Sequence, residues 1–311
     1  MNKKLNFFTI CSFLTTLILL FVTSSTDLIL KPEVDRIYKA TLLISDVDSG
    51  LWQNYKLGVK YASEKYNVDM AIKTLFSFHE DTQQQLEQIM TEIEFGAEGL
   101  ILSTSHFSKT SKLVEEENFK NAVIFTKVDS SFCSDTYGDY SYVYYDYYGA
   151  GKMLGEILQK EHENRKDIFI LTERELSENH TFFIQALKET HHVSILQNAT
   201  LETEGLQQIK TAFGDNDIII GLDENSTLHF TEVKDMPIYS LGHTNTLIDC
   251  VLQGEVEGLI CFDEYKAGFL SVRNLVTVLE GGTIPTCEKI PYKLITKETI
   301  FENEAFLFPI Q

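Results

Sequence analysis

The feature that most constrains this sequence is a regular alternation of short, continuous apolar runs with longer amphipathic stretches. The run Ala40–Val47 (ATLLISDV) is followed by Trp52–Lys65, in which apolar residues recur at helical spacing. The runs Gly99–Ser103 (GLILS) and Asp217–Gly221 (DIIIG) have the same apolar character as the first. Strands that are apolar on both sides and separated by helices predict parallel sheets covered on both faces.

The alternation runs twice along the chain, which predicts two lobes. The first round ends near Tyr140–Tyr145 (YSYVYY), and the second begins with a helix at Gly149–Glu161. A last strand–helix–strand unit, 256–296, has no sheet of its own, so we expect the chain to return to the first lobe and then cross once more. The predicted fold class is α/β, with two doubly wound parallel-sheet lobes, 38–145 plus 263–291 and 146–262 plus 292–311, joined by hinge crossings at Tyr145-Asp146, Phe262-Asp263 and Pro291-Tyr292.

The composition excludes several classes of protein. The 311 residues include 26 Lys+Arg and 46 Asp+Glu, which gives a formal net charge of −20. Nucleic-acid binding requires clustered basic residues, so an acidic chain of this kind predicts no nucleic-acid partner. The sequence shows no catalytic triad, phosphate-binding loop or paired catalytic carboxylates, and His191-His192 lacks carboxylates at metal-ligand spacing. We therefore expect no enzymatic activity, no cofactor and no metal.

The N-terminus has the pattern of an export segment. Lys3 and Lys4 precede Leu5–Val22, an apolar run without charges, and small residues follow it. Residues 1–34 are therefore expected to be a signal peptide or signal anchor that places the rest of the chain outside the cytoplasm. Because Leu5–Val22 is nearly long enough to cross a bilayer, we expect a membrane-anchored form. Cleavage after Ser24 is the alternative.

The five cysteines predict neither a disulfide scaffold nor a zinc site, because they are irregularly spaced and include no CxxC pair. Cys250 and Cys261 lie in periodic apolar segments and are expected to be inert core thiols. Cys133 and Cys287 lie in predicted loops. Both a bridge between these two residues and two free thiols are compatible with the sequence.

Five short motifs occur in a fixed order along the chain: Asp48–Trp52 after the first strand, Gly96–Leu102, Asp146–Gly151 at the first crossing, Gly254–Ile260 and Tyr292–Glu298. In this order the chain resembles the type I periplasmic-binding-protein family, in its ribose-binding branch, from about Tyr38 to the C-terminus. The resemblance implies an exported bacterial receptor whose two lobes close on one small ligand, a carbohydrate. Loops at the carboxyl ends of parallel strands form such a crevice, and the ligand's contacts stabilise the closed state.

The resemblance also implies a partner in the membrane. The first interpretation is a solute-binding protein that delivers its ligand to the permease of an ABC-type transporter. The alternative is a membrane-tethered sugar receptor that signals to the ectodomain of a sensor histidine kinase. The absence of a lipobox at the end of the apolar run and the altered pocket described next are compatible with this alternative.

Several candidate ligand-binding residues depart from the family pattern. Trp52 follows the first strand, where the family places a stacking aromatic; a core role for this sole tryptophan is the alternative. Ser130 stands where an arginine is usual after Asp129, and Asn179 stands where a second arginine is usual. Losing buried hydrogen-bonding groups changes specificity, so the family's usual sugar is not implied, and weak binding or an adaptor role stays open. The full set is Leu51, Trp52, Asp129, Ser130, Asn179, Asp223, His243, Phe262 and Asp263.

Overall fold

The computed structural model describes residues 12–17, 36–44, 50, 52–74, 82–104, 107–116, 122–133, 140–161, 167–173, 175–197, 214, 217–231 and 237–309. The chain divides into two units, Met1–Ile37 and Tyr38–Gln311. In the first unit residues 12–17 are helical, and the rest of the expected export segment lies outside the described residues. Among the described residues, no helix combines the length and the apolar character needed to cross a membrane.

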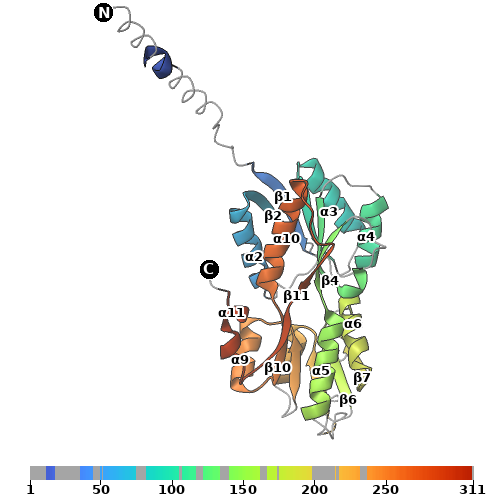
Figure 1. Cartoon of the computed structure of the whole chain (residues 1–311). Coiled ribbons are helices and arrows are strands. Elements are labelled where there is room, and N and C mark those ends of the chain that lie inside the picture. Colours follow the sequence, from blue (N-terminus) through green and yellow to red (C-terminus); the bar gives the residue numbers. More distant parts are fainter. Residues whose placement is uncertain are drawn as a thin grey trace, which may run out of the picture. The chain divides into compact units, whose positions relative to one another are not determined.

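Lobe 1 of the second unit is built on a six-stranded sheet with the order β11-β5-β4-β3-β1-β2, in which all neighbouring strands are parallel (Figure 1). The strands are β1 (Tyr38–Ile44), β2 (Val68–Thr74), β3 (Gly99–Ser103), β4 (Ala122–Asp129), β5 (Ser141–Tyr145) and β11 (Cys287–Ile290). The helices of this lobe are α2 (Gln53–Lys65), α3 (Thr82–Glu94), α4 (Phe107–Glu116) and α10 (Glu264–Leu279), and a 3-10 turn, η1 (Ser130–Phe132), follows β4.

Lobe 2 repeats the plan with the order β12-β10-β9-β8-β6-β7. Its strands are β6 (Asp167–Thr172), β7 (His192–Gln197), β8 (Ile218–Gly221), β9 (Ile238–Leu241), β10 (Gly258–Phe262) and β12 (Tyr292–Thr296). Its helices are α5 (Tyr147–Glu161), α6 (Glu178–Leu187), α8 (Glu224–Thr231), α9 (Asn245–Gln253) and the C-terminal α11 (Glu304–Leu307), which follows a 3-10 turn, η3 (Phe301–Asn303). The predicted α/β class with two parallel-sheet lobes is confirmed, except that β12 runs antiparallel to β10.

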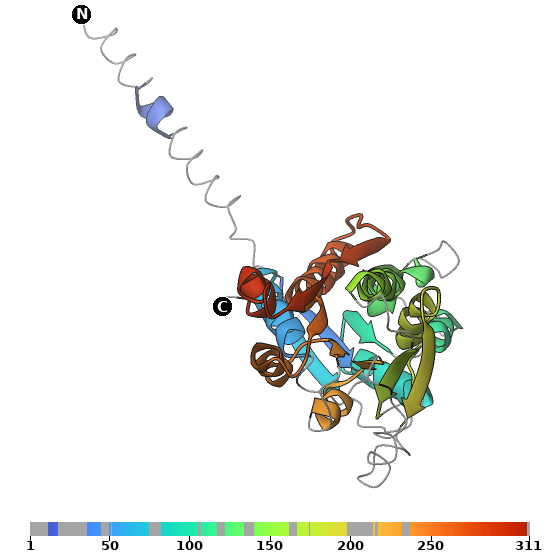
Figure 2. The same cartoon turned by 90° about the horizontal axis from the view of Figure 1, so that it is seen from below.

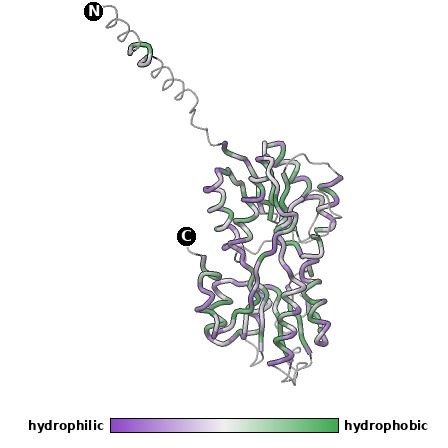
Figure 3. The backbone as a smooth tube through the Cα atoms, viewed as in Figure 1, coloured by the Kyte–Doolittle hydropathy of each residue, from purple (hydrophilic) through white to green (hydrophobic). Residues whose placement is uncertain are grey.

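The strands of both sheets are largely apolar and buried, as the continuous apolar runs predicted. Every residue of β3, β8 and β10 is buried, and Figure 3 shows apolar residues along the strands of both lobes. Burial of both faces by helices explains why these strands do not alternate between apolar and polar residues.

The end of the chain differs from the sequence-based expectation in one respect. The segment Ile290–Thr296 was expected to form a single strand, but Pro291 separates β11 in lobe 1 from β12 in lobe 2. A proline has no backbone N–H for the sheet ladder, so strand pairing is interrupted where it occurs. Helix α8 was not expected, and the expected helix Gly205–Ala212 lies outside the described residues.

Helices α2 and α10 pack against each other with their backbones in close contact on one face of lobe 1 (Figures 1 and 2). A Cβ on Gly58 would lie 2.0 Å from the carbonyl oxygen of Tyr265, and a Cβ on Gly268 would lie 2.1 Å from that of Tyr55. Only glycine allows this approach. The contact places the first turn of α10, which begins with Glu264, against Gly58 in α2.

A disulfide between Cys133 and Cys287 joins the end of η1 to the first residue of β11, with 5.8 Å between the Cα atoms. The sequence was compatible with a bridge or with two free thiols, and the structure contains the bridge. Cys250 and Cys261 are free and buried, as predicted, and burial raises the pKa of the Cys250 thiol to about 11. A thiol with a raised pKa is a poor nucleophile at neutral pH, which agrees with an inert core role.

Candidate functional site

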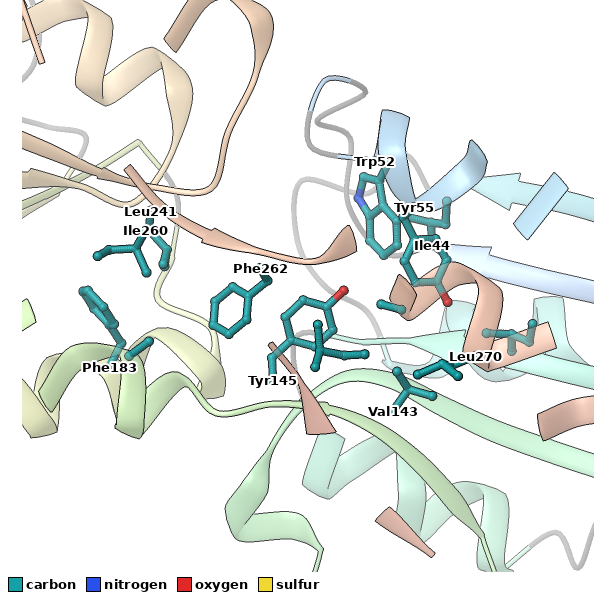
Figure 4. Close-up of a cluster of buried hydrophobic side chains, with 14 of the residues drawn as sticks. Ile44, Trp52, Tyr55, Val143, Tyr145, Phe183, Leu241, Ile260, Phe262 and Leu270 are labelled. Carbon is teal, nitrogen blue, oxygen red and sulfur yellow. The ribbon is translucent and has the colours of Figure 1, made fainter. Parts of the chain in front are cut away.

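The three chain crossings between the lobes meet in one aromatic cluster, and Figure 4 shows two of its members, Tyr145 and Phe262, side by side. The ring of Phe262, which ends β10, lies 4.8 Å from the ring of Tyr145 and 5.6 Å from that of Tyr292, centroid to centroid. The backbone N–H of Asp263 donates to the carbonyl of Pro291 at 2.9 Å. The structure therefore places the expected hinge residues together, and motion about them stays a prediction. Phe262 is only 4 % exposed, so it packs in this cluster.

Asp129, expected to bind ligand, uses its carboxylate to hold two chain segments together. Its Oδ1 accepts from the backbone N–H of Ser131 at 2.9 Å, and its Oδ2 accepts from the backbone N–H of Tyr147 at 3.0 Å. The side chain is 1 % exposed. The first bond caps η1 and the second holds the first residue of α5, as aspartates before helices commonly do. Ser130 directs its hydroxyl to the same carboxylate at 3.4 Å.

Asp223 and Asp263 have similar bonds in the present arrangement. The carboxylate of Asp223 accepts from the backbone N–H groups of Ser226 at 2.8 Å and Glu173 at 3.0 Å, and that of Asp263 accepts from Lys266 at 3.0 Å. Both residues therefore cap the helices that follow them. A ligand role for either residue remains a prediction, and such a ligand would have to share these carboxylates with backbone amides.

Trp52 lies directly before α2, next to a lysine that sequence reasoning missed. The Nζ of Lys127 lies 3.8 Å from the centre of the Trp52 ring and 3.1 Å from the Oε2 of Glu264. The hydroxyl of Tyr145 donates to the same Oε2 at 2.8 Å. Burial raises the pKa of Glu264, and the Lys127 charge opposes that rise. Trp52 itself is 3 % exposed and packs in the hydrophobic core, which agrees with the core alternative, and a ligand role for it stays a prediction.

The signal for Lys127 was present in the sequence but was not used. It is the one charged residue inside the apolar run Ala122–Val128 (AVIFTKV), where a charge must find a partner to be buried. Its partner, Glu264, begins α10, more than a hundred residues later, and sequence spacing does not relate the two. Of the other expected ligand residues, Leu51 lies outside the described residues.

Direct hydrogen bonds connect the two lobes across the cleft. The side-chain amide of Asn179, at the start of α6, donates to the carbonyl oxygen of Lys127 at 2.6 Å. The backbone N–H and hydroxyl of Ser108 on α4 both donate to the carboxylate of Glu178, the N–H at 3.2 Å. Asn179, expected to contact a ligand, thus contacts the opposite lobe. The two lobes are therefore in direct contact through their own polar groups.

A cavity of about 330 Å³ lies between α2 of lobe 1 and α9 of lobe 2, and the C-terminal segment borders it. Asn54 bridges its walls, because its side-chain amide nitrogen lies 3.0 Å from the Nε2 of His243 and 2.7 Å from the carbonyl oxygen of Leu307. His243, an expected ligand residue, is therefore at the cavity wall. Further polar lining comes from Gln53, Thr244, Asn245 and Asp249.

His243 is neutral in this environment. Burial lowers its pKa to about 4, and the nearby charge of Lys127 acts in the same direction. Because the amide nitrogen of Asn54 is a donor, Nε2 must be the acceptor, and a proton on Nε2 would abolish this bond between the lobes.

This burial gives the free energy of unfolding a defined pH dependence. Between pH 6.5, the ordinary pKa of histidine, and about pH 4 the unfolded chain binds a proton at His243 that the folded chain does not. Stability from this residue is therefore complete above pH 6.5 and falls by about 3 kcal/mol as the pH is lowered to 4. We expect His243→Gln, measured by urea unfolding at several pH values, to remove that part of the decline. Equal pH profiles for variant and wild type would contradict it.

Comparison with known proteins agrees with this geometry. Residues 40–283 match the family model described as a periplasmic binding protein domain. The chain therefore belongs to that family, whose members work outside the cytoplasm. A comparison with curated proteins found no relative by sequence.

Solved structures with the same fold are distant in sequence. A carbohydrate transporter from Acidothermus cellulolyticus in complex with myo-inositol has a TM-score of 0.74 at 14% identity, covering 88% of this chain and 98% of its own. A carbohydrate transporter solute-binding protein from Agrobacterium radiobacter in complex with D-arabinose has 0.73 at 14%, covering 87% and 99%. A LacI-type transcriptional regulator from Bacteroides fragilis has 0.72 at 16%, covering 86% and 99%. At these identities the likeness shows the fold, which binding proteins and regulators share.

Proposed function

We propose that this protein is an exported solute-binding protein that captures a small polyhydroxylated ligand, a carbohydrate, between its two lobes and delivers it to an ABC-type transporter. The observation that carries the proposal is the cavity of about 330 Å³, whose walls come from both lobes. Family membership and the sugar and inositol complexes of similar folds support it. In the intact protein, the export segment Leu5–Val22 would hold it at the membrane.

Most of the polar side chains that line the cavity are uncharged, which suits a ligand rich in hydroxyl groups, and Asp249 adds one carboxylate that can accept from hydroxyls. Gln53, Asn54 and Asn245 supply side-chain amides, which both donate and accept, and His243 is neutral. Leu57, Ile248 and Phe308 supply apolar surface for the C–H faces of a sugar. A volume near 300 Å³ is at the lower end of the range for small-molecule sites, which suits a monosaccharide.

A thermal-shift screen with monosaccharides and polyols tests the proposal, because a ligand that binds only the folded protein raises its melting temperature. We expect at least one of these compounds to raise the melting temperature, and we expect Asn54→Ala to remove that rise. The matched control is Asn225→Ala, since Asn225 is exposed and its amide bonds Glu173 away from the cavity. No shift with any compound, or an equal shift in Asn54→Ala, would contradict a carbohydrate site in this cavity.

A further inference from the structure

The surroundings of Lys127 form a cation-binding arrangement that the proposed function does not use. The Nζ of Lys127 lies 3.8 Å from the ring centre of Trp52 and 5.8 Å from the ring centres of both Tyr55 and Tyr145. Glu264 adds a carboxylate oxygen at 3.1 Å, and the side chains of Lys127 and Glu264 are 13% and 12% exposed. Aromatic faces attract an ammonium group, and a carboxylate compensates its charge.

The backbone of β4 is bent in a way that delivers this lysine. Lys127 has φ 55°, a value that side-chain-bearing residues rarely adopt, and the pairing of β4 with β5 shifts register between Thr126 and Val128. Such a bulge inserts one residue into a strand and redirects its side chain. An unfavourable backbone conformation of this kind persists where the surrounding contacts compensate for it.

We propose that Trp52, Tyr55, Tyr145 and Glu264 form a binding site for a primary ammonium group, and that its resident is the chain's own Lys127. The carbonyl oxygen of the same residue accepts the bond from Asn179 in lobe 2, so one residue both fills the site and joins the lobes. The amine covers a face of Trp52 on which a sugar would otherwise stack. The carbohydrate space is then the neighbouring cavity beside α2 and α9, not this face.

Chemical rescue of Lys127→Gly tests the site. Glycine accepts a positive φ without strain, and the substitution removes atoms from Cβ to Nζ, which together have the size and charge of n-butylammonium. We expect n-butylammonium chloride to raise the melting temperature of Lys127→Gly by about 3 °C or more at ten times its dissociation constant. Wild type should show no such rise, and neither should Lys127→Gly with 1-butanol, which has the same chain length without the charge.

Two further variants define specificity. Lys127→Gly combined with Glu264→Gln should lose the response to n-butylammonium. Lys289→Gly is the matched control. Lys289 also pairs with a carboxylate, that of Asp146, and its Nζ lies 5.5 Å from the ring centre of Tyr292, but its side chain is 49% exposed. An equal rise in wild type or Lys289→Gly, or an equal effect of 1-butanol, would overturn the proposal.

If Lys127→Gly does not fold, the fluorescence of Trp52 in Lys127→Met carries the test. An ammonium group over an indole quenches its emission by proton transfer to the excited ring, and Trp52 is the sole tryptophan of the chain. We expect folded Lys127→Met to be brighter than wild type, and unchanged emission would overturn the proposal. No sugar enters either experiment, so failure of the carbohydrate screen and failure of this site are distinguishable.

Discussion

Replacing both Cys133 and Cys287 by serine is expected to lower the free energy of unfolding by about 5 kcal/mol. The two cysteines are 154 residues apart in sequence, so the bridge closes a very long loop and restricts the unfolded chain strongly. For a chain of this size the loss corresponds to a fall in melting temperature of about 10–20 °C. The measurement is thermal and urea unfolding of the double variant beside oxidised wild type.

Wild type treated with a reductant is the control for this experiment. Reduced wild type should approach the stability of the double variant, because both then lack the same cross-link. A melting temperature of the double variant within about 2 °C of oxidised wild type would contradict this prediction, since closure of a loop of 154 residues is expected to have a several-fold larger effect. The bridge also fits an extracytoplasmic protein, because disulfides persist in oxidising compartments.

Lys127→Met is expected to lower the free energy of unfolding by about 3–5 kcal/mol, the usual cost of leaving one member of a buried ion pair without its partner. In this variant Glu264 would keep its buried carboxylate, held by the Tyr145 hydroxyl alone among the contacts given above. The double variant Lys127→Met, Glu264→Gln should recover most of the loss, because the uncompensated charge is gone. Urea unfolding of both single variants and the double variant gives the coupling energy.

The pair Lys289–Asp146 provides the comparison for this cycle. Its nitrogen and oxygen are 2.6 Å apart, but the Lys289 side chain is half exposed, so solvent screens the attraction. We expect a coupling energy below about 1 kcal/mol for this pair. Equal coupling energies for the two pairs would show that Lys127 and Glu264 do not form an ion pair shielded from solvent.

Most of the fold could be predicted because apolar periodicity reports burial directly. The continuous runs that became β3 and β8 are buried on both faces, and such runs admit few other structures. The return of the chain to lobe 1 was expected because the last strand–helix–strand unit, 256–296, had no sheet of its own. The division at Pro291 was missed although its physical signal is plain, since proline has no N–H to pair. The antiparallel direction of β12 depends on which neighbour it meets, and no local pattern fixes that.

The site was less predictable, because the same residue type can serve a ligand or the backbone. Asp129 stands where an aspartate could hold a sugar hydroxyl, yet an aspartate at a strand–helix turn is also the natural partner for free backbone amides. In the structure its carboxylate accepts those amides. Lys127 and Glu264 come together through the packing of α10 on β4 and on α2, and Gly58 and Gly268 allow the second of these contacts. Contacts between residues so distant in sequence are set by tertiary packing.

Isothermal titration calorimetry tests most directly whether the two lobes hold one small polyhydroxylated ligand. The titrant is the sugar or polyol that gives the largest thermal shift, added to wild type, Asn54→Ala and Asn225→Ala. We expect one binding site per chain in wild type and in Asn225→Ala, and an affinity lower by about tenfold or more in Asn54→Ala, which loses a half-buried hydrogen-bonding group at the cavity wall. No binding heat with any compound of the panel, or unchanged affinity in Asn54→Ala, would contradict the assignment of this cavity as a carbohydrate site.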